Sequence, residues 1–372
     1  IVAGPTSGGE NNKGCYLTLY GYSFGRLDQM GTASGARVYI GGVEVDNYRF
    51  LRTSKTYAWS QIVEMCVQVG ALGGASGALD VKVTVNGVDS NTITGGFYVQ
   101  PGRIAFVSQS GSDATGLFDT ISSPFRYIQD YAGGVGSPVA GSLWAATTAQ
   151  GEVGFRGGDF CVLRGGTWVD RVGYDGNWWR FKDKTGTVPN GVAGQGYMTI
   201  QVYPGPALGN APEEVIWASP SGGGNKGGIQ GAGGDNAALG YGRYCVVSGI
   251  VFTGVATSGV GGLVNLQSGA NSWRVVGCEM GPWPSTADAR VGGVAGNGDG
   301  VKLFGNYIHD ISADPTPGNL NHGLYFDGSN SGAWDACAKN CEAAYNVIKN
   351  INNGSSVQYF NQDSSDVITG MS

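Results

Sequence analysis

One octapeptide near the C-terminal end, Asn-His-Gly-Leu-Tyr-Phe-Asp-Gly, gathers residue types that acid–base chemistry uses. Leu324 and Phe326 alternate as inward-facing strand residues, so we expect His322, Tyr325 and Asp327 to project outward together. A histidine beside a tyrosine can serve as base and acid in an elimination reaction. The alternative interpretation is structural, with His322 capping a turn and Tyr325 partly buried in a strand.

Carboxylates lie close to this segment in the sequence. The chain has only two histidines, and the second, His309, falls in the same repeat unit and precedes Asp310. Asp327 with Asp310 or Glu342 could bind a cation or protonate a glycosidic oxygen. Five aspartates crowd a stretch of 37 residues, namely Asp299, Asp310, Asp314, Asp327 and Asp335. Oxygen clusters suit calcium, but no loop matches an EF-hand or RTX pattern, so we predict no metal ligands or cofactor and leave calcium open.

A second group of charges comes from aligned positions in neighbouring repeats. Val246, Arg274, Lys302 and Glu342 occupy one column, which we expect to face outward at steps of about 4.8 Å. A basic pair beside a carboxylate is what β-elimination on a uronic acid needs, because neutralising the substrate carboxylate acidifies the C5 proton. We predict Arg274, Lys302, His322, Tyr325 and Asp327 as catalytic residues. The alternative is a solvated charge ladder in which Lys302 pairs with Glu342.

Aromatic residues suggest a third kind of site. Nine tryptophans are many for a chain with 13% charged residues. Sugar rings dock on aromatic faces, while polar side chains bond their hydroxyl groups. We therefore predict that substrate is bound by His309, Asp310, Trp283, Trp334 and Glu342, although packing in the core is the alternative for tryptophans.

The elements that carry these residues form a repeat. Four segments align at offsets of 28, 28 and 40 residues, namely 245–255, 273–283, 301–311 and 341–351. Apolar residues recur in the same columns, such as Val247, Val275, Leu303 and Ala343. Periods of this size mark repeat architectures in which each unit buries its apolar side against its neighbours. The short, alternating, Gly-rich units predict a parallel β-solenoid.

Composition supports an all-β chain and excludes several classes. Gly makes up 68 of 372 residues without a Gly-X-Y period, which excludes collagen, and 41% of residues are hydrophobic, which excludes a disordered chain. The net charge of −6 argues against nucleic acid as a partner. No run of 18 apolar residues is present, so we predict no membrane-spanning helix. Disulfides could join Cys15 to Cys66 or Cys337 to Cys341.

Residues 1–102 differ from the rest. Short alternating strands are separated by Gly-rich turns, and Val-Asn-Gly-Val at 85–88 is a strong hairpin signal. Gly-Tyr-Ser-Phe-Gly at 21–25, Val-Tyr-Ile-Gly-Gly at 38–42 and Val-Lys-Val-Thr-Val-Asn-Gly at 81–87 resemble the markers of immunoglobulin-like IPT/TIG domains. The resemblance implies a small β-sandwich that serves as a spacer or adhesion module.

Residues 103–372 resemble right-handed parallel β-helix proteins of the pectate lyase-like, polysaccharide lyase superfamily. The likeness is carried by Gly-Ser-Asp at 111–113, Ser-Pro-Phe at 123–125, Gly-Gly-Thr-Trp at 165–168 and Tyr-Pro-Gly at 203–205. It implies an all-β, right-handed solenoid. Ser123 as N-cap and Pro124 at the first helical position predict a short helix over 123–131 that caps the first coil.

Two functions follow as hypotheses. The first is a secreted or surface protein that binds, and cleaves by a lyase-type or hydrolytic reaction, an acidic polysaccharide in a groove along the solenoid. The second is a non-enzymatic fibre component of a phage tail, virion or cell-surface filament. The last residues end within a coil without a cap, which we interpret as an incomplete chain or a contact for oligomer or fibre assembly. The sequence does not specify the sugar.

Overall fold

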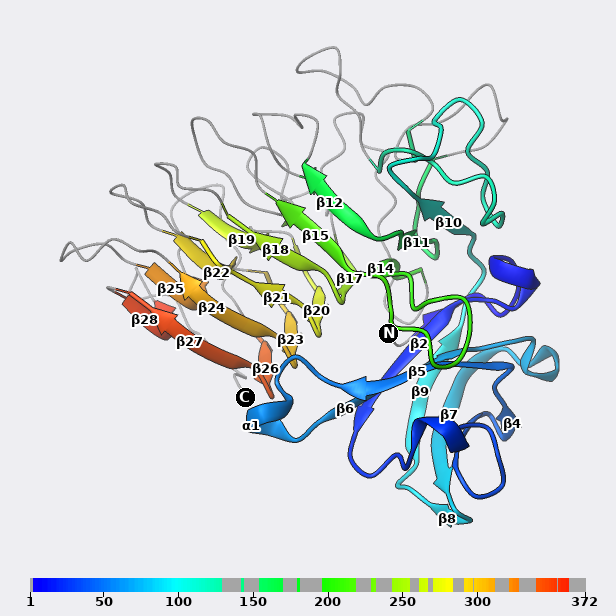
Figure 1. Ribbon diagram of the computed structural model, residues 1–372. Coiled ribbons are helices and arrows are strands. Elements are labelled where there is room, and N and C mark those ends of the chain that lie inside the picture. Colours follow the sequence, from blue (N-terminus) through cyan, green and yellow to red (C-terminus); the bar gives the residue numbers. More distant parts are fainter. Residues whose placement is uncertain are drawn as a thin grey trace.

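The computed structural model describes two β-rich domains that lie side by side (Figure 1). The described residues are 3–128, 142–143, 154–169, 179–180, 196–218, 229–231, 243–254, 261–266, 270–283, 291–296, 298–311, 321–327, 339–352 and 354–360. Among them, no helix is long and apolar enough to cross a membrane.

The first domain contains two sheets packed around one core. One sheet has the order β1 (Ala3–Gly4), β9 (Ile93–Val99), β7 (Gly77–Val85), β3 (Ala36–Ile40) and β4 (Val43–Glu44), with β8 (Val88–Asp89) paired to β7. The other is antiparallel and has the order β2 (Tyr16–Gly21), β6 (Val63–Gln68) and β5 (Asn47–Thr53). Single turns of helix are α1 (Tyr57–Ser60), η1 (Glu10–Asn12), η2 (Leu27–Gln29) and η3 (Leu72–Gly74).

The second domain is a three-sided solenoid of parallel strands, in which each coil visits three faces in turn. The first face holds β10 (Ile104–Val107), β11 (Phe160–Leu163), β14 (Met198–Val202), β17 (Cys245–Ser248), β20 (Arg274–Val276), β23 (Lys302–Phe304) and β26 (Glu342–Ala344). The second face holds β12 (Gly166–Val169), β15 (Val215–Ala218), β18 (Val251–Thr253), β21 (Glu279–Met280), β24 (Tyr307–Ile311) and β27 (Val347–Ile351). The third face holds β13 (Trp179–Arg180), β16 (Ile229–Gly231), β19 (Gly261–Leu266), β22 (Val291–Gly296), β25 (Asn321–Asp327) and β28 (Gly354–Phe360). The predicted all-β fold with a parallel β-helix is confirmed.

The register of the coils follows the sequence repeat. Val247 pairs with Val275, Val275 with Leu303, and Leu303 with Ala343, as the alignment predicts. Val247, Val275 and Leu303 are fully buried in the solenoid core. Stacking therefore gives each coil the apolar cover that a single short unit lacks.

Asparagine side chains hold the tight corner between the first and second faces. Asn306 accepts from the backbone N–H of Cys278 at 3.0 Å and donates to the carbonyl of Val275 at 2.9 Å. Asn346, one coil further, accepts from Asn306 and donates to Leu303 at 2.8 Å. These bonds satisfy backbone groups that the turn would otherwise bury without partners.

The helix predicted over 123–131 is wrong for its described part, residues 123–128. Phe125 forms a parallel bridge with Val107, and its N–H donates to Phe106 at 2.9 Å. Phe125 and Ile128 are buried in the solenoid core. An extended segment satisfies the free edge of β10 directly, which a helix cannot do, and this outweighs the local capping signal. Residues 129–131 lie outside the described residues.

The first domain packs against the outward side of the first face. Phe106 and Phe160 from the solenoid share a buried cluster with Leu17 and Val67 from the three-stranded sheet. The domain is thus fixed against the solenoid, whereas the resemblance implied a spacer. The predicted boundary near residue 102 falls between β9 and β10. Disulfides are not formed at Cys15, Cys66 or Cys341, which are buried free thiols.

Candidate functional site

The predicted site residues are distributed over all three faces of the solenoid, so they do not line one groove. Eight of them lie in named strands: Arg274, Lys302 and Glu342 on the first face, His309 and Asp310 on the second, and His322, Tyr325 and Asp327 on the third. The repeat specified which residues are neighbours along a face, but not the angle through which each coil turns between faces.

The charged column on the first face forms the ladder that was the alternative interpretation. Its predicted register is present, with Arg274 beside Lys302 and Lys302 beside Glu342. Lys302 Nζ lies 3.0 Å from Glu342 Oε2, and both side chains are partly exposed. The Arg274 guanidinium lies over the Tyr197 ring at 5.1 Å. Because Lys302 and Arg274 are engaged in this way, the geometry gives no support for a free base here.

The two tryptophans predicted to bind substrate do not contribute to a described surface. Trp283 is buried and packs in the solenoid core, so its assignment as a binding residue is wrong. In the sequence repeat Trp283 aligns with Ile311 of the next coil, which is also a core residue. A parallel β-bridge pairs these two residues directly. Trp334 lies outside the described residues.

His322 and Tyr325 lie against each other on the third face. Their ring centroids are 4.8 Å apart with an interplanar angle of 17°. Alternation was the wrong reason to predict an outward His322, because it places residue 322 on the same side as Leu324 and turns only Tyr325 and Asp327 outward. The strand departs from alternation at Gly323, where a side chain would lie 2.5 Å from Ile348 Cγ2, which packs on the core. Two successive residues, Gly323 and Leu324, therefore face inward, and this brings His322 and Tyr325 to the same side.

His322 is a buried residue, 7% exposed. Burial lowers its pKa below the usual histidine value, so the ring is neutral near pH 7. Within the part of the chain that the structure describes, its Nδ1 has no hydrogen-bond partner. A neutral ring with an unused nitrogen is the form that a general base requires. The side chain of Asp327 lies outside the described residues.

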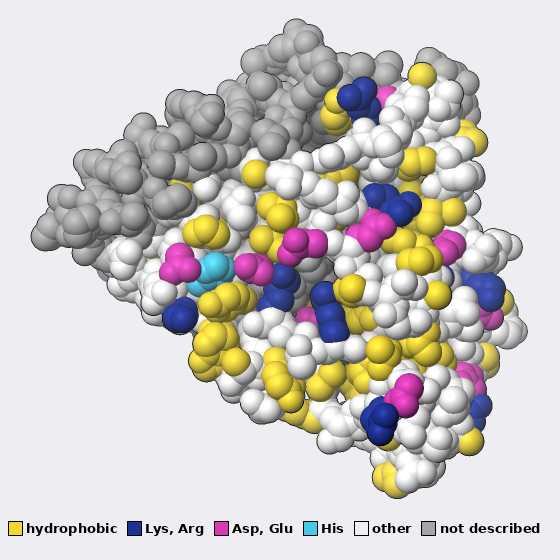
Figure 2. Space-filling view, in the orientation of Figure 1, with side chains coloured by type: hydrophobic (Ala, Val, Ile, Leu, Met, Phe, Trp, Pro, Cys, Tyr) yellow, Lys and Arg dark blue, Asp and Glu magenta, His cyan; other side chains and the backbone are white. Residues whose placement is uncertain are grey.

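A denser group of charges and rings lies where the first domain meets the second face. We call it the seam cluster, and it consists of Lys55, Trp59, Glu279, Tyr307, His309 and Asp310. Figure 2 shows a histidine between acidic side chains on this side of the molecule, with basic and hydrophobic side chains beside it.

The charges of the seam cluster form one chain of contacts. Lys55 Nζ lies 2.8 Å from Glu279 Oε2, and Glu279 Oε1 lies 3.2 Å from His309 Nε2. His309 Nδ1 lies 2.7 Å from Asp310 Oδ2, and Asp310 Oδ1 accepts from Asn350 on the next coil at 2.7 Å. The hydrogen bond from His309 lowers the pKa of Glu279 to about 2 and holds that of Asp310 low, and the bond to Glu279 raises the pKa of His309.

The rings of the seam cluster form a stack that crosses the domain boundary. Tyr307 lies between His309, at a centroid distance of 4.3 Å, and Trp59 of α1, at 5.7 Å. Trp59 is nevertheless 57% exposed. The stack therefore holds a large aromatic surface in a fixed position in front of solvent.

His309 is not placed to act as a base, since both of its ring nitrogens already face carboxylates. Lys55 and Trp59 were missed by reasoning from the sequence, because they lie more than 200 residues before their partners and in the other domain. One sequence signal for Lys55 and Trp59 was present, namely two aromatic residues, Tyr57 and Trp59, close together in a short segment between strands.

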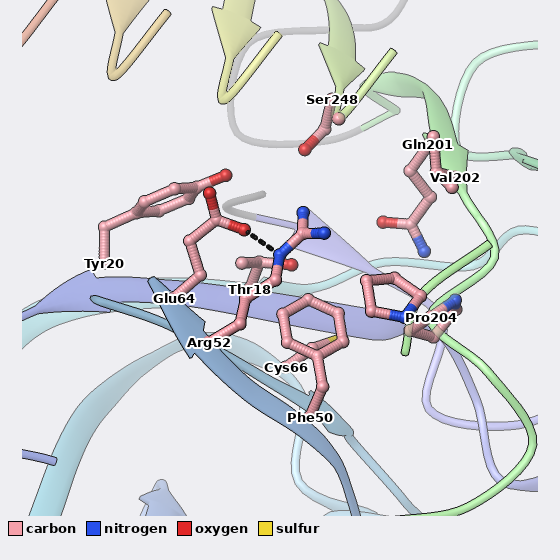
Figure 3. A pocket seen from close by; sticks show the side chains of 12 residues that line it. Thr18, Tyr20, Phe50, Arg52, Glu64, Cys66, Gln201, Val202, Pro204 and Ser248 are labelled. Carbon is pink, nitrogen blue, oxygen red and sulfur yellow. Dashed lines mark hydrogen bonds and ion pairs between the residues drawn. The ribbon is translucent and has the colours of Figure 1, made fainter. Parts of the chain in front are cut away.

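A small pocket separates the two domains further along the seam (Figure 3). Tyr20, Arg52 and Glu64 of the three-stranded sheet face Gln201 and Ser248 of the solenoid. Its cavity volume of about 30 Å³ holds one or two water molecules and is far too small for a sugar ring. Burial raises the pKa of the Glu64 carboxyl, and its ion pair with Arg52 at 2.8 Å offsets only part of this.

No group of three or more possible metal ligands comes together among the described residues. Two of the five aspartates that left calcium open, Asp314 and Asp335, lie outside that part of the chain.

Comparison with known proteins gives distant likenesses only. No protein-family model and no curated protein matches the sequence. The crystal structure of pectate lyase Pel9A aligns with a TM-score of 0.35 and 11% identity over 73% of this chain and 58% of that one. A rhamnogalacturonan lyase aligns with a TM-score of 0.29 and 16% identity over 73% of this chain and 61% of that one. This chain thus spans about three fifths of the length of these structures.

Proposed function

We propose that this protein binds a polysaccharide at the seam cluster, with Trp59 as the platform for a sugar ring. The observation that carries the proposal is an exposed tryptophan whose ring is supported from below, because Trp59 stacks on Tyr307 and Tyr307 stacks on His309. The apolar face of a sugar packs on such a ring, and preorganisation reduces the entropy lost on binding.

Polar groups next to the platform suit the hydroxyl groups of a sugar. Asp310 is half-exposed, and Lys349 and Asn350 on the next coil are exposed beside it. Planar carboxylate and amide groups fix the orientation of a ligand through hydrogen bonds. A polysaccharide of this kind is met outside the cell, so a secreted or surface location is part of the proposal.

The charge of the site does not demand a polyanion. The site has a net charge of one positive unit. It contains three positive groups, which are Lys55, Lys349 and protonated His309, and two carboxylates, which are Glu279 and Asp310. A neutral or weakly acidic polysaccharide therefore fits the seam cluster at least as well as a densely charged one.

The test is affinity for a panel of neutral and acidic polysaccharides, measured by affinity electrophoresis and calorimetry. Trp59→Ala should raise the Kd by roughly tenfold or more, because tryptophan platforms carry about 2 kcal/mol of binding energy. Tyr22→Ala is the matched control, since Tyr22 is 55% exposed in the same domain and lies outside the seam cluster. Absence of binding to every polysaccharide, or equal affinity of Trp59→Ala and the wild type, would overturn the proposal.

Cleavage is a second candidate function, favoured by the neutral His322 ring on the third face. In β-elimination the imidazole takes the C5 proton of a uronic acid, the electrons form the C4–C5 double bond, and the glycosidic oxygen leaves with a proton from a donor. Incubation with pectate, alginate and glycosaminoglycans should then give unsaturated products that absorb in the ultraviolet. No product from any of them would exclude the reaction, and full activity of His322→Ala would exclude this site.

A further inference from the structure

We propose that His309 is a proton-linked latch that holds the Trp59 platform in place, so that polysaccharide affinity falls as pH rises above neutrality. The inference rests on the proposed function and adds its regulation. It is carried by the arrangement of His309 between two carboxylates and against the ring that supports Trp59.

Both nitrogens of His309 face atoms that can only accept a hydrogen bond. Nδ1 lies 2.7 Å from Asp310 Oδ2, and Nε2 lies 3.2 Å from Glu279 Oε1. A carboxylate has no proton to donate when ionised, and the pKa values of both acids are lowered. The imidazole can satisfy both contacts only when both of its nitrogens carry protons.

Other titratable groups around the ring come from the segment before α1, from β27 and from β24 itself. Lys55, just before α1, pairs with the second oxygen of Glu279, and Lys349 on β27 is the neighbour of His309 in the next coil. Tyr307 stacks on the ring, and burial together with the nearby acids raises the pKa of its hydroxyl, so it stays neutral. Histidine is the side chain that ordinarily changes its charge near pH 7, so His309 is the proton-linked group of this arrangement.

Loss of one proton opens the latch. A neutral ring donates to one carboxylate and presents a lone pair to the other, which is a repulsive contact. The repulsion is relieved when the ring turns, and turning removes its stacking on Tyr307, which lies directly under Trp59. The bonds to Glu279 and Asp310 raise the pKa of His309, so the latch is complete below about pH 6.5 and is lost as pH rises through the higher pKa of the folded protein.

The first experiment compares affinity with the titration of His309. From about pH 5.5 to about pH 8.5 the wild-type Kd should rise roughly fivefold or more, the usual size of a coupling between two sites. Since the chain has two histidines, imidazole NMR resolves His309, and His309→Gln removes its signal. The affinity midpoint should match that titration, and His309→Gln should bind independently of pH. A flat wild-type profile, or a midpoint that does not match, would overturn the latch.

A second variant should reverse the pH dependence. In Glu279→Gln the amide oxygen can accept from Lys55 while the amide N–H donates to a neutral Nε2 of His309. Its Nδ1–H still donates to Asp310, so the latch is closed at high pH, and protonation of the ring now sets two donors against each other. Affinity should then be greater at about pH 8.5 than at about pH 5.5. A profile with the wild-type sign contradicts the latch.

The latch can be separated from the proposed function. With fluorotryptophan incorporated, the Trp59 resonance, assigned by Trp59→Phe, should shift with the midpoint of the His309 titration. If it does so while no polysaccharide binds at any pH, the latch holds and the proposed function is wrong. If binding is strong but the Trp59 resonance does not follow His309, the function stands and the latch is wrong.

Discussion

Replacing Arg49 by methionine should weaken the contact between the two domains. The Arg49 side chain is 3% exposed and lies 2.9 Å from Glu10 Oε2. It also donates to the carbonyl oxygens of Gly205 and Pro206 in the solenoid, at 3.2 and 2.6 Å. Arg49→Met keeps the volume of the aliphatic stem but removes the charge and all of these donors.

The expected loss follows from the partners that remain. Breaking a buried ion pair by removing one member costs about 3–5 kcal/mol, because the other charge stays buried. Glu10 keeps hydrogen bonds from the hydroxyls of Tyr16 at 2.8 Å and Tyr203 at 3.2 Å, which favours the lower end of that range. The two carbonyl oxygens of Gly205 and Pro206 lose their charged donor as well. We therefore expect a loss of about 4 kcal/mol in the free energy of unfolding.

Equilibrium unfolding in urea, followed by circular dichroism and fluorescence, measures this loss. Arg37→Met is the control, because Arg37 is also paired, with Glu44, but is partly exposed and should change stability by less than about 1 kcal/mol. Glu10→Gln in the Arg49→Met background should restore more than half of the loss, since no unpaired charge is then buried. If Arg49→Met costs no more than Arg37→Met, the reasoning about the buried charge fails.

Two further predictions concern charged side chains outside the seam cluster. Lys302→Ala should leave polysaccharide binding and any cleavage unchanged. It should lower the free energy of unfolding by less than about 1 kcal/mol, because the ion pair with Glu342 is partly exposed. A large loss of binding or cleavage would show that the charged column on the first face belongs to the functional site. Glu64→Gln should remove a pH dependence of the free energy of unfolding. Because burial raises the pKa of Glu64, its contribution to stability is complete below the ordinary pKa of 4.5 and is lost as pH rises through its pKa in the folded protein. Unfolding temperatures of wild type and variant from about pH 4 to about pH 8 check this, and parallel profiles would contradict it.

The coils could be predicted because sequence alignment and spatial contact coincide in a solenoid. Val247, Val275 and Leu303 pair in the order in which they align, since parallel strands one coil apart keep their register. The position of each face could not be read in this way. His309 and His322 belong to one coil but to different faces, because a corner of unknown angle lies between them.

Local signals also failed where long-range pairing was stronger. Residues 123–128 carry a helix N-cap and a proline at the right spacing, yet Phe125 pairs with the edge of β10 and enters the core. The free edge of a sheet binds any extended segment that can reach it, and no feature of residues 123–128 alone reveals that β10 is such an edge.

The position of the first domain explains why the seam cluster could not be foreseen from either domain. At the corner between the first and second faces, five coils turn through only two residues, as between β20 and β21. The first domain approaches this corner closely. At Gly277 of the corner, a side chain would lie 2.4 Å from the hydroxyl oxygen of Tyr20 in the first domain. Strand β5 can therefore lie along the corner, with Arg49 fixed near its start and Lys55 just after its end.

These two anchors determine where α1 can lie. Arg49 binds the turn after β14, and Lys55 binds Glu279 two coils further along the solenoid. With both ends of β5 fixed, the short segment that follows has to place Trp59 over the next coil, where it meets Tyr307. The platform is thus a product of docking: the solenoid supplies the supporting ring and the charges, the first domain supplies the exposed indole, and neither carries the site alone.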